Sequence, residues 1–316
     1  MEDFEQYRVA LTGYCYRMLG AAFEAEDAVQ ETFVRAWRKA DAFDARRGPF
    51  STWLYAIATN VCLDFLRGKQ RRAVVMDLAS PVAPGTPLGV PLADEAWVQP
   101  MPDERILDPA NVLVRRESVQ LAFVAALQHL PPKQRAVLIL RDVLAWHADE
   151  VAALLESTVP SVNSALQRAR ATLATRPAAG PVTALDETHQ DLMRRYVRAF
   201  REYDIETLVS LLHEDATMTM PPFLWWLRGR SAIHQTLLAA GAEVSCRTTV
   251  LVPAGLANGA PVYAQYGPDG PFALVTFTTA GGLVTGETVH LNGTGLFPLF
   301  GLPLKLTDEL REAASY

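Results

Sequence analysis

The sequence has little cysteine and no cluster of metal-binding residues. Its three cysteines, Cys15, Cys62 and Cys246, are far apart, and no CxxC motif or group of cysteines and histidines accompanies them. Structural zinc sites need closely spaced ligands, and secreted domains that depend on disulfides usually carry an even number of cysteines. The scarcity therefore argues against a structural metal, gives no reason to expect a cofactor, and favours the reducing cytoplasm.

Long hydrophobic runs are also missing, although 50% of the residues are hydrophobic. A membrane-spanning helix needs about 20 consecutive apolar residues, and no run approaches that length. The first ten residues, MEDFEQYRVA, lack the basic and then apolar pattern of a secretion signal. We therefore expect no membrane partner.

Positive charge is in deficit overall but not everywhere. The formal net charge is −6 over 316 residues. Residues 1–72 carry a balance of +1 and residues 113–176 carry +3, whereas residues 73–112 and 177–316 carry −5 each. The two segments with a positive balance are compatible with phosphate contact, so the overall acidity does not exclude nucleic acid as a partner.

Prolines and glycines mark the boundaries between the parts of the chain. Six prolines lie within residues 74–103, and a second break, TRPAAGPV, spans residues 175–182. Such stretches predict linkers. The periodicity before and between them is helical, and the part after the second break mixes helices with strands. The predicted parts are a helical domain at 1–72, a Pro-rich acidic linker at 73–111, a second helical domain at 112–176 and a mixed domain at 187–316.

Residues 147–173 have the pattern of a helix-turn-helix. HADEVAALL (147–155) has apolar residues on one side, ESTVP (156–160) breaks the pattern, and SVNSALQRARATL (161–173) resumes it. The polar face of the last helix has no acidic residue and consists of Asn163, Ser164, Gln167, Arg168 and Arg170. Such side chains suit base edges and phosphates in the major groove. An ordinary amphipathic surface helix has the same pattern, and this run alone does not decide between the two.

Two further amphipathic helices are predicted in the first 72 residues. FEAEDAVQETFVRAW (23–37) places Ala28, Val29, Phe33 and Trp37 inward, with Trp37 as a core residue. STWLYAIATNVCLDFLRGKQRR (51–72) carries an apolar stripe and ends in four basic residues, Arg67, Lys69, Arg71 and Arg72. Basic residues near a helix C-terminus also stabilise the helix dipole, so their position has a structural explanation beside a DNA-binding one.

These segments resemble regions 2 and 4 of extracytoplasmic-function (ECF) sigma factors. The resemblance rests on YRMLG (16–20), EDAVQETFVRAW (26–37), TWLYAIATNVCLDFLR (52–67), LPPKQRAVLILRDV (130–143) and SVNSALQRARATL (161–173), in the order of the family. Two positions depart from the family pattern, because Glu156 stands where the turn usually has glycine and Pro160 begins the recognition helix. The resemblance implies two all-α sigma domains that direct core RNA polymerase to promoter DNA.

The resemblance also implies a role for each group of polar and aromatic residues. The face that binds the β′ clamp helices of the polymerase would be Asp27, Gln30, Glu31 and Arg35, and region 4 would contact the β flap. The pocket for a base flipped out of the −10 element would be Phe43, Trp53, Ile57 and Asn60, with Arg67, Lys69, Arg71 and Arg72 on the phosphates. The reader of the −35 element would be Asn163, Ser164, Gln167, Arg168 and Arg170. The acidic linker would extend toward the active-site cleft of the polymerase.

Residues 187–316 look like a SnoaL-like α+β cone. Helices are predicted at 187–204, 205–215 and 231–241, strands at 216–220, 246–254, 261–267, 271–280 and 283–292, and a loop at 221–230. The stretch MPPFLWWLRGR is similar to ECF sigma factors that carry this domain as a C-terminal extension. The mouth of such a cone often holds a small apolar ligand, which is therefore a candidate partner.

Three residues of that loop and the apolar tail have two interpretations each. Trp225 and Trp226 either line a pocket or pack in a core or interface, and Arg230 either begins a helix or contacts another domain. The tail GTGLFPLFGLPLKL (293–306) either docks on a sigma domain or closes its own cone.

The sequence favours a regulator over an enzyme. His234 and His290 are isolated, and no strand offers a clear aspartate partner, so we predict no catalytic residue. The resulting prediction is an ECF sigma factor that its C-terminal domain regulates in cis. The alternatives are a stand-alone helix-turn-helix regulator with a ligand domain, which would bind promoters without core polymerase, and an enzyme with a vestigial helix-turn-helix. The match of residues 26–37 to the clamp-binding face favours the sigma factor.

Overall fold

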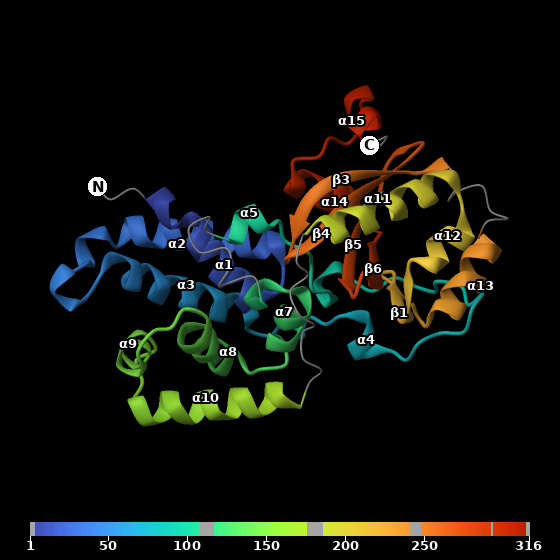
Figure 1. Ribbon diagram of the computed structural model, residues 1–316. Helices are drawn as coiled ribbons and strands as arrows, with labels where there is room; N and C mark the ends of the chain where they lie inside the picture. Colours follow the sequence, from blue (N-terminus) through green and yellow to red (C-terminus); the bar gives the residue numbers. More distant parts are fainter. Residues whose placement is uncertain (1–3, 108–116, 176–185, 241–247, 292, 314–316) are drawn as a thin grey trace. The chain divides into compact units, whose positions relative to one another are not determined.

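The computed structural model describes residues 4–107, 117–175, 186–240, 248–291 and 293–313. The chain divides into two compact units, and Figure 1 shows the elements of each. The helical unit comprises Met1–Ala73 with Val98–Gly180, and the C-terminal unit comprises Val74–Trp97 with Pro181–Tyr316. We call residues 74–97 the linker segment. The first part of the predicted linker therefore belongs to the C-terminal unit.

The regular elements described in the helical unit are all helical, as the sequence predicts. They are η1 (Phe4–Tyr7), α1 (Arg8–Leu19), α2 (Ala22–Arg38), η2 (Ala40–Ala42), η3 (Ala45–Arg47), α3 (Phe50–Leu66), α5 (Asp103–Ile106), η6 (Glu117–Val119), α7 (Leu121–Leu127), α8 (Pro132–Leu138), the π-helical turn η7 (Ile139–Val143), α9 (Ala148–Leu154) and α10 (Val159–Ala174).

Helix α1 lies at the centre of the helical unit. It contacts α2, α3, α5, α7 and α8, so that its side chains are buried all round from Leu11 to Leu19. A helix that is apolar on all sides needs such a position. The hydroxyls of Tyr14 on α1 and Thr59 on α3 lie 2.7 Å apart in this core. Burial raises the pKa of Tyr14 well above its usual range.

A buried arginine joins α1 to the second helical domain. The guanidinium of Arg135 on α8 donates hydrogen bonds to the Gln128 side chain at 2.5 Å, to the carbonyls of Gln128 and Leu130 at 3.1 Å, and to the carbonyl of Met18 at the end of α1. Burial lowers the pKa of Arg135 to about 10. Buried polar groups of this kind specify one arrangement, so the two helical domains pack as one unit here.

The C-terminal unit combines helices with one mixed sheet. Its helices are α4 (Val75–Leu78), η4 (Asp94–Ala96), α11 (Glu187–Glu202), α12 (Ile205–Ser210), α13 (Arg230–Ala240), α14 (Gly293–Leu296), η9 (Phe297–Phe300) and α15 (Asp308–Ala313). Its strands are β1 (Leu212–Thr219), β2 (Trp226–Arg228), β3 (Val250–Ala257), β4 (Ala260–Gly267), β5 (Gly270–Ala280) and β6 (Leu283–His290).

The sheet has the strand order β2-β1-β6-β5-β4-β3 among the described residues. Strands β1 and β6 are parallel, and the other neighbours are antiparallel. Two predictions were wrong here. The helix predicted at 205–215 ends at Ser210, because Leu212 begins a strand that pairs with Val284, and the predicted loop at 221–230 contains β2, in which Trp226 pairs with Thr219.

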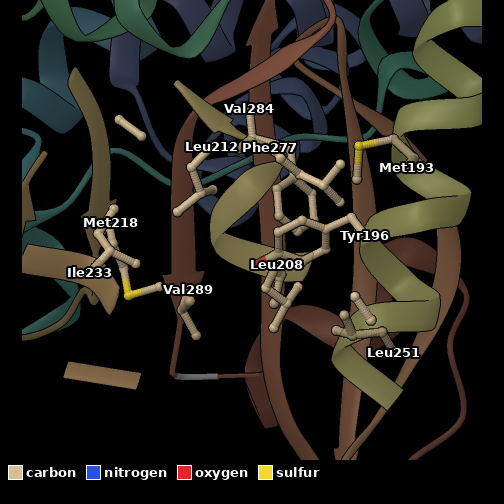
Figure 2. Packing of buried hydrophobic residues seen from close by; sticks show 14 of the residues in the cluster. Met193, Tyr196, Leu208, Leu212, Met218, Ile233, Leu251, Phe277, Val284 and Val289 are labelled. Carbon is tan, nitrogen blue, oxygen red and sulfur yellow. The ribbon is translucent and has the colours of Figure 1, made fainter. Parts of the chain in front are cut away.

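Each face of this sheet has its own apolar core. On one face, α11, α12 and α13 pack on the strands, and Figure 2 shows Tyr196 of α11 beside Phe277 of β5. On the other face, the tail packs on β3, β4 and β5, with the rings of Phe297 and Tyr266 4.9 Å apart. The Tyr266 hydroxyl also donates to the Pro303 carbonyl at 2.9 Å. Of the two interpretations of the tail, the structure therefore gives the one in which it closes its own domain.

Candidate promoter and polymerase interfaces

Helix α10 presents the polar face that the sequence predicts. Thr158 caps the helix by accepting a hydrogen bond from the Ser161 amide at 3.3 Å, and Pro160 lies in the first turn. Val162, Leu166 and Ala169 are buried on the inner side. The outer side consists of exposed residues, namely Asn163, Ser164, Gln167, Arg168 and Arg170. This side is therefore available to a DNA groove.

Arg170 differs from the other residues on this face because an acid already binds its guanidinium. Two of its nitrogens donate to the Asp142 carboxylate at 2.7 and 2.9 Å, and Asp142 raises the pKa of Arg170. This fork-shaped pair braces α10 against η7. Arg168 is thus the better candidate for a base contact, whereas Arg170 supports the position of the helix.

The turn before α10 has a strained backbone at Glu156. Its φ angle of 49° lies in the left-handed region, where a side chain costs free energy and glycine does not. The Ser157 amide closes the turn by donating to the Ala152 carbonyl at 2.8 Å. The departure from glycine therefore preserves the turn at a cost in stability.

The structure brings two of the predicted −10 pocket residues together and adds a third ring. The ring centroids of Phe43 and Trp53 are 5.5 Å apart, and Phe50 packs on both, at 5.1 and 5.4 Å. Trp53, Ile57 and Asn60 share one face of α3 because they are spaced by four and three residues. Ile57 is buried and Asn60 is exposed. Phe50 was not predicted, because its role depends on the loop that returns Phe43 to α3.

The four basic residues after α3 are in different environments. The Arg67 guanidinium is 3.1 Å from the Asp64 carboxylate and is 81% exposed, and Arg71 contacts the ring of His129. Lys69 and Arg72 both lie 2.7 Å from Glu24 of α2. The Arg72 side chain is only 7% exposed. Arg67, Lys69 and Arg71 therefore remain at the surface, whereas Arg72 holds this segment against α2.

The predicted clamp face on α2 is partly paired within the chain. Asp27 and Gln30 are exposed, whereas Glu31 and Arg35 are half-buried. The Arg35 guanidinium donates to Glu31 at 2.7 Å and to Asp64 at 3.1 Å, which raises the pKa of Arg35. Asp27 and Gln30 therefore face solvent directly, and the Glu31–Arg35 pair flanks them.

The prediction that Trp37 lies in the core was wrong. Its side chain is 65% exposed, because the buried side of α2 continues to Ala36 and Trp37 is one position further round the helix. Phe23 and Val34 are also exposed, at 40% and 41%. These three residues share one face of α2 with the exposed Asp27 and Gln30. We call this face the α2 outer stripe, which consists of Phe23, Asp27, Gln30, Val34 and Trp37. Exposed aromatic and apolar side chains in a row are typical of an interaction surface.

Trp225 and Trp226 bind the linker segment, which belongs to the same unit. The indole N–H of Trp225 donates to the Thr86 carbonyl at 2.8 Å, and that of Trp226 donates to the Ala79 carbonyl at 2.9 Å. Both side chains are buried. Of the predicted alternatives, the tryptophans therefore pack in a core. Arg230 is the first residue of α13 and is exposed.

A buried carboxyl in the sheet core escaped the sequence analysis. The Tyr196 hydroxyl donates to Glu287 on β6 at 3.0 Å, and burial raises the pKa of Glu287 to about 7 although this hydrogen bond opposes the rise. Burial also lowers the pKa of His290 to about 4. His234 instead lies at the surface, 3.0 Å from Glu206. No sequence pattern links Tyr196 to Glu287, so no local signal could have found the pair.

Neither a metal site nor a membrane-spanning helix is present among the described residues. No group of histidine, cysteine or acidic residues in the described ranges could hold a metal ion. In the same part of the chain, no helix is long and apolar enough to cross a membrane.

Comparison with known proteins agrees with this geometry. The family models of sigma-70 region 2 and sigma-70 region 4 match residues 4–72 and 120–173. The ECF RNA polymerase sigma factor SigG of Mycobacterium tuberculosis is 43% identical over 308 residues, which cover 95% of this chain and 82% of SigG. SigJ of the same species is 29% identical over 222 residues, covering 69% of this chain and 64% of SigJ.

The fold has a relative among solved structures. The crystal structure of Mycobacterium tuberculosis SigJ matches with a TM-score of 0.61 and 23% identity, over 96% of this chain and 99% of that one. The protein is thus an RNA polymerase sigma factor of the sigma-70 type. More closely, the chain belongs to the ECF RNA polymerase sigma factors. The predicted family and fold class, two all-α sigma domains and a C-terminal α+β SnoaL-like cone, are confirmed.

Proposed function

We propose that α10 reads the −35 element of the promoter from the major groove. The observation that carries this proposal is its exposed polar face, which has no acidic residue and follows a capped helix-turn-helix. Asn163, Gln167 and Arg168 carry the donors and acceptors that base edges require, and Ser164 suits a phosphate. The Asp142 pair gives Arg170 a role in positioning α10 on η7.

The aromatic cluster of region 2 is the proposed −10 site. Phe43, Phe50 and Trp53 offer ring faces to an unstacked base, and Asn60 offers amide groups to its edge. Stacking on aromatic rings is worth about 1–3 kcal/mol per base, which offsets the cost of flipping a base out of the duplex. Arg67, Lys69 and Arg71 would then contact the backbone phosphates.

The α2 outer stripe is the proposed contact with the β′ clamp helices of core polymerase. Asp27 and Gln30 supply polar groups between the apolar side chains of Phe23, Val34 and Trp37. Interfaces of this type derive most of their affinity from a few aromatic anchors. Trp37 is the largest exposed apolar residue of the stripe and is the proposed anchor. Region 4 would contact the β flap.

We further propose that the C-terminal unit regulates these activities in cis. The −10 and −35 elements lie about 25 base pairs apart, which corresponds to about 85 Å of B-DNA. Regions 2 and 4 are packed together in the helical unit through Arg135, so this arrangement suits an idle chain. The acidic balance of residues 177–316 and the capture of the linker segment support a regulatory role.

The C-terminal unit is proposed to act without catalysis, in the cytoplasm where core polymerase works. The Tyr196–Glu287 pair is isolated in an apolar core, and His290 lies on the opposite face of the sheet, beside Leu274 in the register. A small apolar ligand in the cone would act as an effector that favours one arrangement of the chain.

In vitro transcription with core polymerase tests the proposal. The full chain is compared with a chain that ends at residue 176, on the same promoter and with core affinity measured separately. We expect the yield of transcript to change several-fold. An unchanged yield with normal core affinity would leave the C-terminal unit without a regulatory role. Specific promoter binding by the full chain in the absence of core polymerase would instead support a stand-alone regulator.

A further inference from the structure

The linker segment runs along one edge of the C-terminal unit. We call residues 220–228 the clasp, which ends in the edge strand β2. The clasp donates from the indoles of Trp225 and Trp226 to the carbonyls of Thr86 and Ala79, at 2.8 and 2.9 Å. It accepts from the amides of Val82 and Leu92, through the carbonyls of Trp226 and Pro222, both at 2.9 Å. Four hydrogen bonds thus join the two segments.

All four contacts involve main-chain atoms of the linker segment. Within residues 79–92 the large apolar side chains of Leu88, Val90 and Leu92 are exposed, at 37%, 84% and 37%, whereas that of Val82 packs on the core of the sheet. The two ends of the linker segment are held by side chains, because Val75 and Trp97 are buried against Trp226.

Recognition through the main chain depends little on the side chains of the bound peptide. The linker segment turns at residues 83–86, where the Thr86 amide and hydroxyl donate to the Ala83 carbonyl at 3.2 and 2.7 Å and Gly85 has a φ angle of 81°. Proline followed by glycine favours such a turn.

We propose that the clasp is a binding site for proline-containing peptides that adopt the turn of residues 83–86, occupied in the idle chain by residues 79–92. A segment of this kind in a partner protein would release the linker segment by competing for the clasp. This proposal rests on the proposed regulation in cis and identifies the element that is regulated. It also gives the inducing signal a chemical form, namely a peptide with a Pro-Gly turn and free main-chain carbonyls on both sides of the turn.

Binding in the clasp is strong enough to hold a tethered segment but weak enough to be reversed. A single hydrogen bond changes an affinity by about twofold to tenfold. The ends of the linker segment adjoin Ala73 and Val98, which are joined by a hydrogen bond of 3.1 Å within the helical unit. Tethered segments have effective concentrations near the millimolar range. A free peptide must therefore bind well, or the tethered copy must be removed.

The test uses the full chain with residues 79–92 replaced by a glycine-serine sequence of equal length. The probe is a fluorescent, capped peptide of residues 78–93. We expect it to bind the replaced chain at least tenfold more tightly than the natural chain, in which the clasp is occupied. Trp225→Phe and Trp226→Phe, made in the replaced chain, keep an aromatic ring and remove the indole donor. Each should weaken peptide binding about twofold to tenfold.

A matched pair of peptides isolates the main-chain contacts. Methylation of the Val82 nitrogen removes the donor to Trp226 and should weaken binding, whereas methylation of the Val90 nitrogen should not. Equal effects of the two methyl groups would overturn the proposal, as would equal affinity for the natural and the replaced chain. If the replaced chain fails to fold, hydrogen exchange at Val82 in the full Trp226→Phe chain takes its place. Faster exchange supports the clasp, and unchanged exchange overturns it.

These measurements need no polymerase, so the proposal that the clasp binds peptides is tested separately from the proposal of regulation in cis. Loss of peptide binding with a several-fold effect of truncation at residue 176 would reject the clasp alone. Peptide binding without an effect of truncation would retain the site and reject the regulation. When both hold, the peptide of residues 78–93 should change transcription by the natural chain in the same direction as truncation does.

Discussion

In the helical unit, the residues proposed to bind DNA and polymerase lie mainly on the outer faces of α2, α3 and α10, whereas the C-terminal unit has its distinctive polar groups inside. Asn163 and Asp27 are exposed. Glu287 and His290 are buried in the sheet, and the indoles of Trp225 and Trp226 are buried beneath the linker segment.

The difference teaches what a substitution in each unit should change. An exposed side chain contributes little to folding, so its loss should affect binding and leave stability intact. A buried titratable group carries a desolvation cost, so its replacement should affect stability and its dependence on pH. Four substitutions test this contrast, in order of decreasing effect.

Glu287→Gln should produce the largest change, in the stability of the C-terminal unit. The folded-state pKa of about 7 lies above the ordinary value of 4.5, so folding favours the neutral carboxyl. The shifted pKa of Glu287 therefore stabilises the natural chain fully below about pH 4.5, and this stabilisation is lost as the pH rises to about 7. Glutamine is neutral throughout, so the variant should be more stable at pH 8 by up to about 3 kcal/mol and equal near pH 4.5.

Urea unfolding at pH 5 and pH 8, followed by hydrogen exchange in β5 and β6, measures this effect. The difference between the variant and the natural chain isolates Glu287, because burial lowers the pKa of both His290 and His189 in either chain. Those histidines destabilise both chains as the pH falls. A difference in stability that does not grow between pH 5 and pH 8 would show that Glu287 is not held neutral.

Trp37→Ala should weaken binding to core polymerase by about 2 kcal/mol or more, since aromatic anchors dominate such interfaces. Because the side chain is 65% exposed, the free energy of unfolding should stay within about 0.5 kcal/mol. Titration of core polymerase and thermal unfolding measure the two quantities. Leu238→Ala, at an exposed apolar residue of α13, is the matched control and should leave core binding unchanged. A large loss of stability on Trp37→Ala would contradict the surface assignment.

Arg168→Ala should reduce the preference for promoter over random DNA by about 1–3 kcal/mol, since a bidentate base contact has that value. Core binding should not change. Arg170→Ala is the control on the same helix, and its effect should be smaller and accompanied by a loss of stability from the Asp142 pair. The affinities for promoter DNA and for random DNA, measured at one salt concentration, test this prediction. An equal loss on promoter and random DNA would make Arg168 a phosphate contact.

The helical unit could be predicted from sequence because its signals are local. The cap at Thr158, the proline at position 160 and the buried stripe of α10 lie within one short segment. The prediction for Trp37 failed because an apolar residue at the edge of a helical stripe can face either side. The structure places the boundary at Ala36.

The C-terminal unit was harder to predict because its contacts are distant in sequence. Strand β2 has three residues and exists through pairing with β1, so the loop pattern of residues 221–230 hid it. The carboxyl of Glu287 meets the Tyr196 hydroxyl across 91 positions. The clasp joins Trp225 to Thr86 across 139 positions. Composition suggests a linker at residues 73–111 and cannot indicate that residues 74–97 pack on the C-terminal domain.

Glu156→Gly should have the smallest effect and sharpens the contrast within the helical unit. The φ angle of 49° costs a residue with a side chain roughly 1–2 kcal/mol, and glycine avoids this cost. Part of the gain is offset because glycine increases the conformational entropy of the unfolded chain. A net stabilisation of about 0.5–1 kcal/mol is expected, with DNA binding unchanged because the face of α10 keeps its place. Glu156→Ala is the matched control and should give no gain, since alanine keeps the left-handed strain. Thermal unfolding of the three chains measures the effect. A gain with alanine equal to that with glycine would trace the effect to the lost carboxylate, and lost promoter binding with glycine would mean that the rigid turn positions α10.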